Sequence, residues 1–86
     1  MDAKERLNKA IREVVENQLR DLDPPETTET FHRLIEEGYS EEQARTLIGF
    51  VVASEIFDIL KHRQPYNHER FVEALRRLPE LPREES

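Results

Sequence analysis

Apolar residues in the middle of the chain recur with helical spacing on two adjacent stripes. Between Ala44 and Leu60, one stripe holds Ile48, Val52, Ile56 and Ile59, and the other holds Phe50, Ala53, Phe57 and Leu60. At about 100° per residue the two stripes cover more than half of a helix circumference. A helix this apolar needs several neighbouring helices, or neighbours and a partner chain, to cover it.

Three shorter amphipathic segments surround this central one. Their apolar residues fall on one face each: Leu7, Ile11, Val14, Val15, Leu19 and Leu22 in residues 3–22; Phe31, Leu34 and Ile35 in residues 24–37; and Phe71, Leu75 and Leu78 in residues 68–78. Such spacing is typical of helices that lie on a core. The sequence therefore predicts an all-α fold, a compact four-helix domain whose third helix, about residues 41–62, is central.

Two prolines mark the corner between the first and second helices. Proline interrupts a helix but suits its first turn, so Pro24 and Pro25 end the first helix and begin the second. Asp23 is expected to cap the second helix, with Glu26 in the position of a capping-box acid.

The other two corners carry equally specific signals. Gly38 is expected in the left-handed conformation after the second helix, and Ser40 with Gln43 predicts a capping box at the start of the third. Asn67 is the expected N-cap of the last helix, and Tyr66 and Phe71 have the spacing of a hydrophobic staple across its first turn.

Gly49 lies inside the third helix, where glycine costs roughly 1 kcal/mol relative to alanine. With Ala53 one turn later it leaves a shallow groove between the two apolar stripes. A close helix crossing explains this glycine, and the crossing element is either the first helix or another subunit.

Gln18 falls at the centre of the apolar arc of the first helix, and Glu55 borders the stripes of the third. A buried amide costs about 1–3 kcal/mol when it lacks a hydrogen-bond partner. One interpretation pairs Gln18 with Glu55 in the core. The other places Gln18 at the rim, with its amide in water.

The 86 residues form one domain, residues 1–80, followed by a proline-containing, charged tail, residues 81–86, that is expected to be disordered. There is no cysteine, and the N-terminus lacks the apolar core of a signal peptide. The apolar run of residues 47–60 is too short for a membrane span and contains Glu55 and Asp58. A soluble, cytoplasmic protein is expected.

The formal net charge is −6, which disfavours binding to nucleic acid or to an anionic membrane. Residues 61–77 have the opposite net charge, with five basic and two acidic residues. A solvated face of an amphipathic helix explains this run, and a phosphate-binding patch is the alternative.

Candidate chemistry is sparse. His32 and Glu36 lie four residues apart, but no HExxH motif and no paired HxxxH motif supplies a metal-ligand set. No nucleophile elbow and no glycine-rich phosphate loop is present either. We therefore expect no catalytic residue, no cofactor and no metal site, and hence no enzymatic activity.

Several segments together resemble a bacterial family of small all-helical domains of unknown function. They are the run VVENQL at residues 14–19, the turn DPPE at residues 23–26 and the helix FVEALRRL at residues 71–78. Members of that family often carry histidines where this chain has Asn8, Arg12, Glu42 and Thr46. The resemblance implies an all-helical cytoplasmic domain and supplies no activity.

The favoured function is that of a noncatalytic protein-interaction domain or a small regulatory domain. Its partner is another protein or a second copy of the chain, because apolar surface is left over on the third helix. The candidate interaction or close-packing surface comprises Gly49, Phe50, Ala53 and Phe57. The alternative is an accessory or metal-dependent enzyme domain that has lost the histidines of its relatives.

Overall fold

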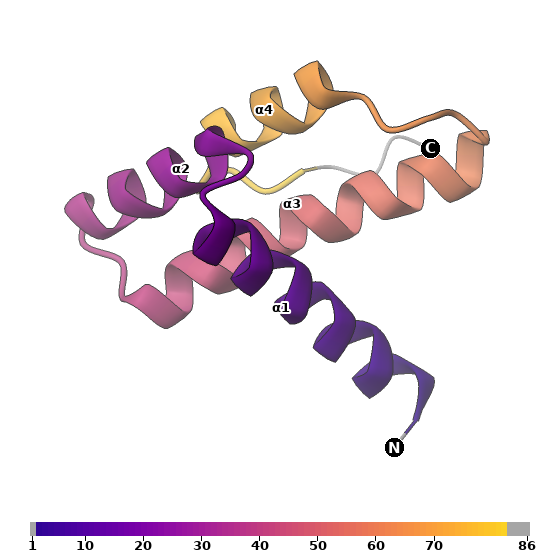
Figure 1. Cartoon of the computed structure of the whole chain (residues 1–86), viewed down its shortest axis with the longest axis horizontal. Coiled ribbons are helices and arrows are strands. Elements are labelled where there is room, and N and C mark those ends of the chain that lie inside the picture. The colour runs from indigo at the N-terminus through magenta and orange to yellow at the C-terminus, as the bar shows by residue number, and fades with distance from the viewer. Residues whose placement is uncertain (1, 83–86) are drawn as a thin grey trace.

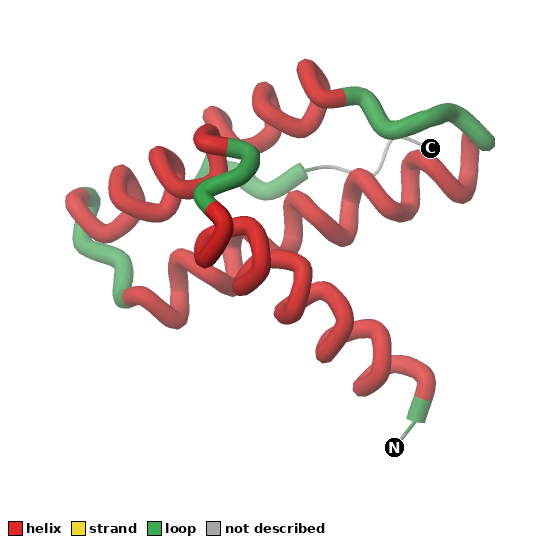
Figure 2. Tube along the Cα trace, in the orientation of Figure 1, coloured by secondary structure: helices red, strands yellow, loops and turns green. Residues whose placement is uncertain are grey.

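The computed structural model describes residues 2–82 and contains four α-helices, shown in chain order in Figure 1. They are α1 (Ala3–Asp21), α2 (Pro25–Glu36), α3 (Glu41–His62) and α4 (His68–Arg77). Short turns and loops connect them, and no strand occurs within residues 2–82 (Figure 2). The all-α prediction is confirmed, and the predicted third helix agrees with α3 at both ends.

α3 is the central helix, as predicted. α1, α2 and α4 all pack against it, and α2 also contacts both α1 and α4. In Figure 1, α1 crosses α3 steeply, whereas α2 and α4 lie along the upper side of α3. The first half of α1 consequently extends away from the other three helices.

The hydrophobic core lies between α3 and the facing sides of its three neighbours. Its most deeply buried apolar side chains are Val15, Leu34, Ala44, Ile48, Val51, Leu75 and Leu78. Phe31, Val52 and Phe71 complete the same cluster. The first predicted stripe of the third helix thus faces the core. Val51, which belongs to neither predicted stripe, is buried in the same core.

The apolar arc predicted for the first helix is buried only in part. Val15 is buried, and Ile11 and Leu19 are partly buried against the core. Leu7 remains exposed because every residue from Asp2 to Ala10 lies beyond the crossing with α3, and Val14, next to the crossing, is exposed as well. The expectation that this whole arc covers the core is wrong for Leu7 and Val14, and also for Leu22 after the end of the helix.

The corner between α1 and α2 differs from its prediction. Pro24, not Asp23, is the N-cap of α2, and no side chain caps this helix. Steric contact with Pro25 disfavours helical ψ at the preceding residue, and Pro24 accordingly has an extended ψ of 150°. The helix therefore begins at Pro25, one residue too late for an Asp23 cap.

The corner between α2 and α3 follows its prediction. Gly38 has φ +105°, and the backbone N–H groups of Gly38 and Tyr39 donate to the carbonyls of Ile35 and Leu34. These two bonds form a Schellman motif. Ser40 and Gln43 then form both bonds of the capping box at the start of α3.

The start of α4 is also as predicted. The Asn67 side chain accepts a hydrogen bond of 3.0 Å from the backbone N–H of Arg70. The rings of Tyr66 and Phe71 lie with their centroids 6.0 Å apart, as a hydrophobic staple requires. After α4 the chain continues without a helix to Pro82, and the predicted tail falls largely on residues 83–86, outside the described residues.

Candidate functional site

The second apolar stripe of α3 lies on the outer face of the helix, turned away from the core. We call Phe50, Ala53, Phe57 and Leu60 the outer stripe. Phe50 is 50% exposed, Phe57 53% and Leu60 70%, while Ala53 is partly buried. Their spacing of three and four residues keeps them in one row along the helix. This row leaves three large apolar side chains exposed by half or more within the described residues 2–82.

Gly49 stands beside the outer stripe, where α1 crosses. A Cβ atom placed on Gly49 would lie 3.5 Å from Cγ2 of Ile11, which is ordinary van der Waals contact. Of the two crossing elements that the sequence left open, the structure therefore has the first helix. Gly49 belongs to an intramolecular packing position, and the exposed candidates are Phe50 and Phe57.

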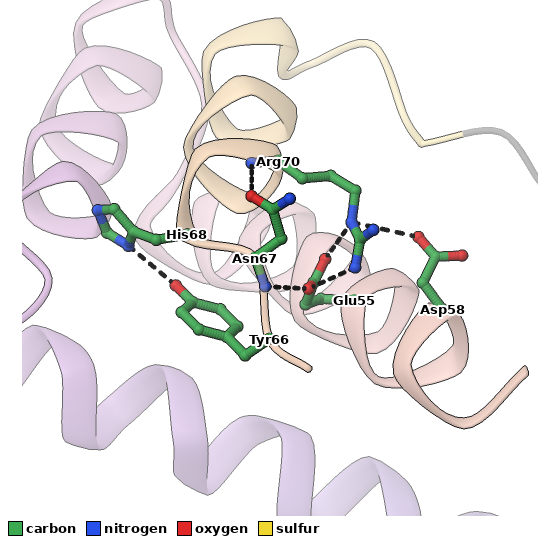
Figure 3. Close-up of polar contacts among 6 residues, drawn as sticks. All are labelled: Glu55, Asp58, Tyr66, Asn67, His68 and Arg70. Carbon is green, nitrogen blue, oxygen red and sulfur yellow. Dashed lines mark hydrogen bonds and ion pairs between the residues drawn. The ribbon is translucent and has the colours of Figure 1, made fainter. Parts of the chain in front are cut away.

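A polar cluster occupies the opposite side of α3, where α4 begins (Figure 3). Glu55 is buried, with only 6% of its surface exposed. Its carboxylate accepts hydrogen bonds from Arg70 Nε at 3.0 Å and Nη2 at 2.8 Å, and from the backbone N–H of Asn67 at 3.2 Å. Asp58 adds a longer contact of 3.9 Å to Arg70 Nε. This network fixes the first turn of α4 on α3.

The proposed pairing of Gln18 with Glu55 is wrong. The amide oxygen of Gln18 accepts a hydrogen bond of 2.9 Å from the hydroxyl of Thr27, which is itself buried on α2. The tight corner between α1 and α2 brings these two residues together, and Glu55 is satisfied by α4 instead. The rim interpretation is closer, since Gln18 is partly exposed, although its amide also bonds within the protein.

Charge and hydrogen bonding set the protonation state of the cluster. Burial acts to raise the pKa of Glu55, but the hydrogen bonds from Arg70 and Asn67 and the charge of Arg70 outweigh it and lower this pKa. The hydrogen bonds to Glu55 and the negative charges of Glu55 and Asp58 raise the pKa of Arg70, against a smaller opposing effect of burial. Glu55 is therefore an ionised carboxylate whose oxygens are occupied, which makes it a structural group and a poor acid or base.

A second polar array joins the first turns of α2 and α4. The Tyr66 hydroxyl lies 3.0 Å from Nδ1 of His68, and Nε2 of His68 lies 3.5 Å from a carboxylate oxygen of Glu26. Burial raises the pKa of Tyr66, and Glu55, Glu26 and Asp23 raise it further, so the phenol stays protonated near neutral pH. The array was not foreseen in the sequence, because its three members lie on separate elements.

The basic run at residues 61–77 is partly neutralised within the fold. Arg70 bonds to Glu55, and Arg77 forms an i,i+4 ion pair with Glu73. Glu73 in the run and Glu55 on α3 thus each hold one of its arginines. The solvated-face interpretation fits this arrangement better than a phosphate-binding patch.

The three histidines, His32, His62 and His68, are all exposed. Within residues 2–82 no three His, Asp or Glu side chains are grouped closely enough to hold a metal ion. Asn8, Arg12, Glu42 and Thr46, the positions at which the resembled family carries histidines, are likewise exposed. No helix of the described part is long and apolar enough to cross a membrane.

Comparison with known proteins gave no match to a family model, to a curated protein or to a solved structure. The resemblance to a bacterial helical family stays a prediction.

Proposed function

We propose that this protein is a noncatalytic protein-interaction domain that binds its partner through the outer stripe of α3. The observation that supports the proposal is the half or greater exposure of Phe50, Phe57 and Leu60 in one row. Contiguous apolar surface of this kind, on a monomer, is characteristic of interaction sites. Phenylalanine rings are large contact groups, and they lose few rotatable bonds when a partner covers them.

The arrangement of the row suits a helical partner. Positions i, i+3, i+7 and i+10 of α3 line up along the helix axis, as the anchors of helix-in-groove recognition do. α3 is also held on its other sides by three helices, so the row is presented on a supported scaffold. A partner helix lying along α3 would bury all four side chains.

The outer stripe alone supplies limited affinity. Covering the exposed parts of its three large side chains contributes roughly 3–5 kcal/mol, whereas a micromolar complex needs about 8 kcal/mol. The partner must therefore also contact surface next to the stripe. The first half of α1 is the neighbouring element that offers such surface.

The noncatalytic part of the proposal rests on the state of the polar groups. Glu55 and Arg70 bond to each other, and Tyr66 has a raised pKa that disfavours a phenolate nucleophile. The alternative, an accessory or metal-dependent enzyme domain, is tested by calorimetric titration with zinc and nickel. Binding heat together with a raised melting temperature would support that alternative.

Site-specific photocrosslinking in the cells that produce the protein tests the interaction itself. A photoreactive phenylalanine analogue at position 57 is expected to give discrete protein adducts. The same analogue at Glu29, an exposed position on α2, is the matched control. Adducts at position 57 no stronger than those at position 29 would refute the proposal, and Phe50→Ser should weaken genuine adducts.

A further inference from the structure

We infer that the partner of the outer stripe is the first half of α1 from a second copy of the chain. The inference rests on the proposed function and names the partner for the same site. In the resulting twofold dimer, α1 of each copy packs along α3 of the other.

The second apolar row lies on α1. We call Ala3, Leu7, Ala10 and Val14 the α1 stripe. All four are exposed, Leu7 by 41% and Val14 by 36%. Their spacing of four, three and four residues matches the three- and four-residue spacing of the outer stripe, which is the repeat by which paired helices interlock. The chain therefore carries two uncovered rows with the same period.

The two rows face the same space. Glu16 of α1 forms an ion pair with Arg45, in the second turn of α3. Leu7 and Val14 lie about 160–180° around α1 from Glu16, so they face the opposite end of α3, where Phe57 and Leu60 are. Figure 1 shows these halves of α1 and α3 diverging from their crossing. The side chains on both arms keep a third or more of their surface exposed within residues 2–82.

The rows are complementary in size. The outer stripe has two phenylalanines, one leucine and one alanine, whereas the α1 stripe alternates two alanines with a leucine and a valine. Small residues in one row leave holes for large side chains of the other, as in ridges-into-grooves packing. Two copies of the α1 stripe would instead place alanine against alanine, which fills space poorly.

Charge supports the same pairing. Residues 3–14, which contain the α1 stripe, hold four basic and two acidic residues, so their net charge is +2. Residues 41–62 of α3 hold two basic and four acidic residues; without Glu55, which is buried and paired with Arg70, their net charge is −1. α1 is thus attracted to α3 of another copy and repelled by a second α1.

Twofold symmetry makes the arrangement self-consistent. An isologous interface repeats each contact, so one α1–α3 contact generates a second of the same kind. The dimer has two such contacts, so it covers twice the apolar area of one. The second contact supplies the additional buried surface that one outer stripe lacks. The exposed first half of α1 gains the tertiary packing that short helices require.

The experiment is sedimentation velocity on the purified full chain from about 1 to 500 µM. The wild type is expected to shift from monomer to dimer over this range. Leu7→Glu and Phe57→Glu should each weaken self-association by at least about tenfold, with helical circular dichroism unchanged because both sites are exposed. Leu22→Glu is the matched control, since Leu22 is 64% exposed but lies outside both stripes.

A charge pair tests which helices pair. In the proposed dimer, both contacts of the double variant Leu7→Lys/Phe57→Glu place the new lysine against the new glutamate, whereas each single variant places a charge against an apolar side chain. The double variant should therefore associate at least about threefold more tightly than the sum of the two single-variant losses predicts. Pairing of α1 with α1 and of α3 with α3 would set like charges against each other, so a double variant that associates no better than this sum overturns the inference.

A wild-type chain that stays monomeric over the whole range also overturns this inference. That result leaves the proposed function standing if position 57 still forms discrete adducts with a different protein. Monomeric behaviour together with an absence of such adducts would remove both proposals.

Discussion

At the scale of single residues, the two glycines have different backbone conformations. Gly38 has φ +105°, a conformation that side-chain-bearing residues adopt at a cost, whereas Gly49 lies in the regular helix α3. Gly38→Ala should lower the free energy of unfolding by about 1–2 kcal/mol. Gly49→Ala should raise it by about 0.5–1 kcal/mol, because the added methyl group fits against Ile11 and favours helix. Urea denaturation measures the free energy of unfolding of both variants. Changes of the same sign would contradict the different backbone conformations of the two glycines.

A larger side chain at Gly49 has the opposite effect. Leucine would extend beyond the 3.5 Å contact with Ile11 and push α1 away from α3. Gly49→Leu should therefore destabilise the protein by about 1–3 kcal/mol. His62→Ala, at an exposed position, should change stability by less than about 0.5 kcal/mol and serves as the control. Thermal melts compare the two variants, and a Gly49→Leu protein that melts like the wild type would refute the close crossing.

Glu55 couples stability to pH. Its pKa is lowered in the folded protein, so its contribution is fully present above the unfolded-state pKa, about 4.3, and is lost as pH falls through the folded value. Glu55→Gln should lower the free energy of unfolding by about 1–3 kcal/mol at neutral pH, because a neutral amide bonds less strongly to Arg70. This difference from the wild type should shrink below about pH 4.

Urea denaturation at several pH values measures the difference. Glu73→Gln is the matched control, because Glu73 also pairs with an arginine but is exposed, and such pairs contribute about 0.3–0.5 kcal/mol. A Glu55→Gln difference that stays constant from neutral to acidic pH would show that the carboxylate charge is not the cause.

At the scale of helices, local sequence signals predicted the ends of α3 and the caps of α3 and α4. Capping depends on residues within one turn, so Ser40, Gln43 and Asn67 carry the information themselves. The start of α2 was wrong by one residue because the effect of Pro25 on Pro24 overrides the preference of Asp23 for a cap. The pairing of Gln18 was wrong because its partner depends on how the corner between α1 and α2 is folded.

The end of α1 offers a prediction at this scale. Leu22 is the C-cap of α1 and has φ +54°, and it is largely exposed. Leu22→Gly should raise the free energy of unfolding by about 0.5–1 kcal/mol, since glycine adopts this conformation without steric cost. Asp21→Gly, one residue earlier and still in the helix, should lower it by a similar amount. Thermal denaturation of the two variants measures these effects. Equal changes in stability would contradict the assignment of Leu22 as the left-handed C-cap of α1.

At the scale of the whole molecule, the sequence predicted surplus apolar surface on α3 but not its counterpart on α1. Helical periodicity shows which face of α1 is apolar, and the position of the crossing with α3 decides how much of that face is covered. The crossing depends on side-chain packing at Ile11 and Gly49, which periodicity does not describe. The exposure of Leu7 and Val14 follows only from the assembled fold.

The uneven distribution of charge over the molecule gives the last prediction. The net +2 of residues 3–14 attracts the net −1 that α3 carries without the buried Glu55 in another copy, and salt screens this attraction beyond about 8 Å at physiological ionic strength. The dimer dissociation constant should therefore rise severalfold as sodium chloride increases from about 0.05 to 0.5 M. Lys4→Glu with Arg6→Glu should weaken the dimer at low salt and flatten this dependence. Sedimentation equilibrium at each salt concentration measures both effects. A dissociation constant that falls steadily with salt would mean that repulsion, not attraction, acts between the facing helices, and that α1 does not lie against α3 of the other copy.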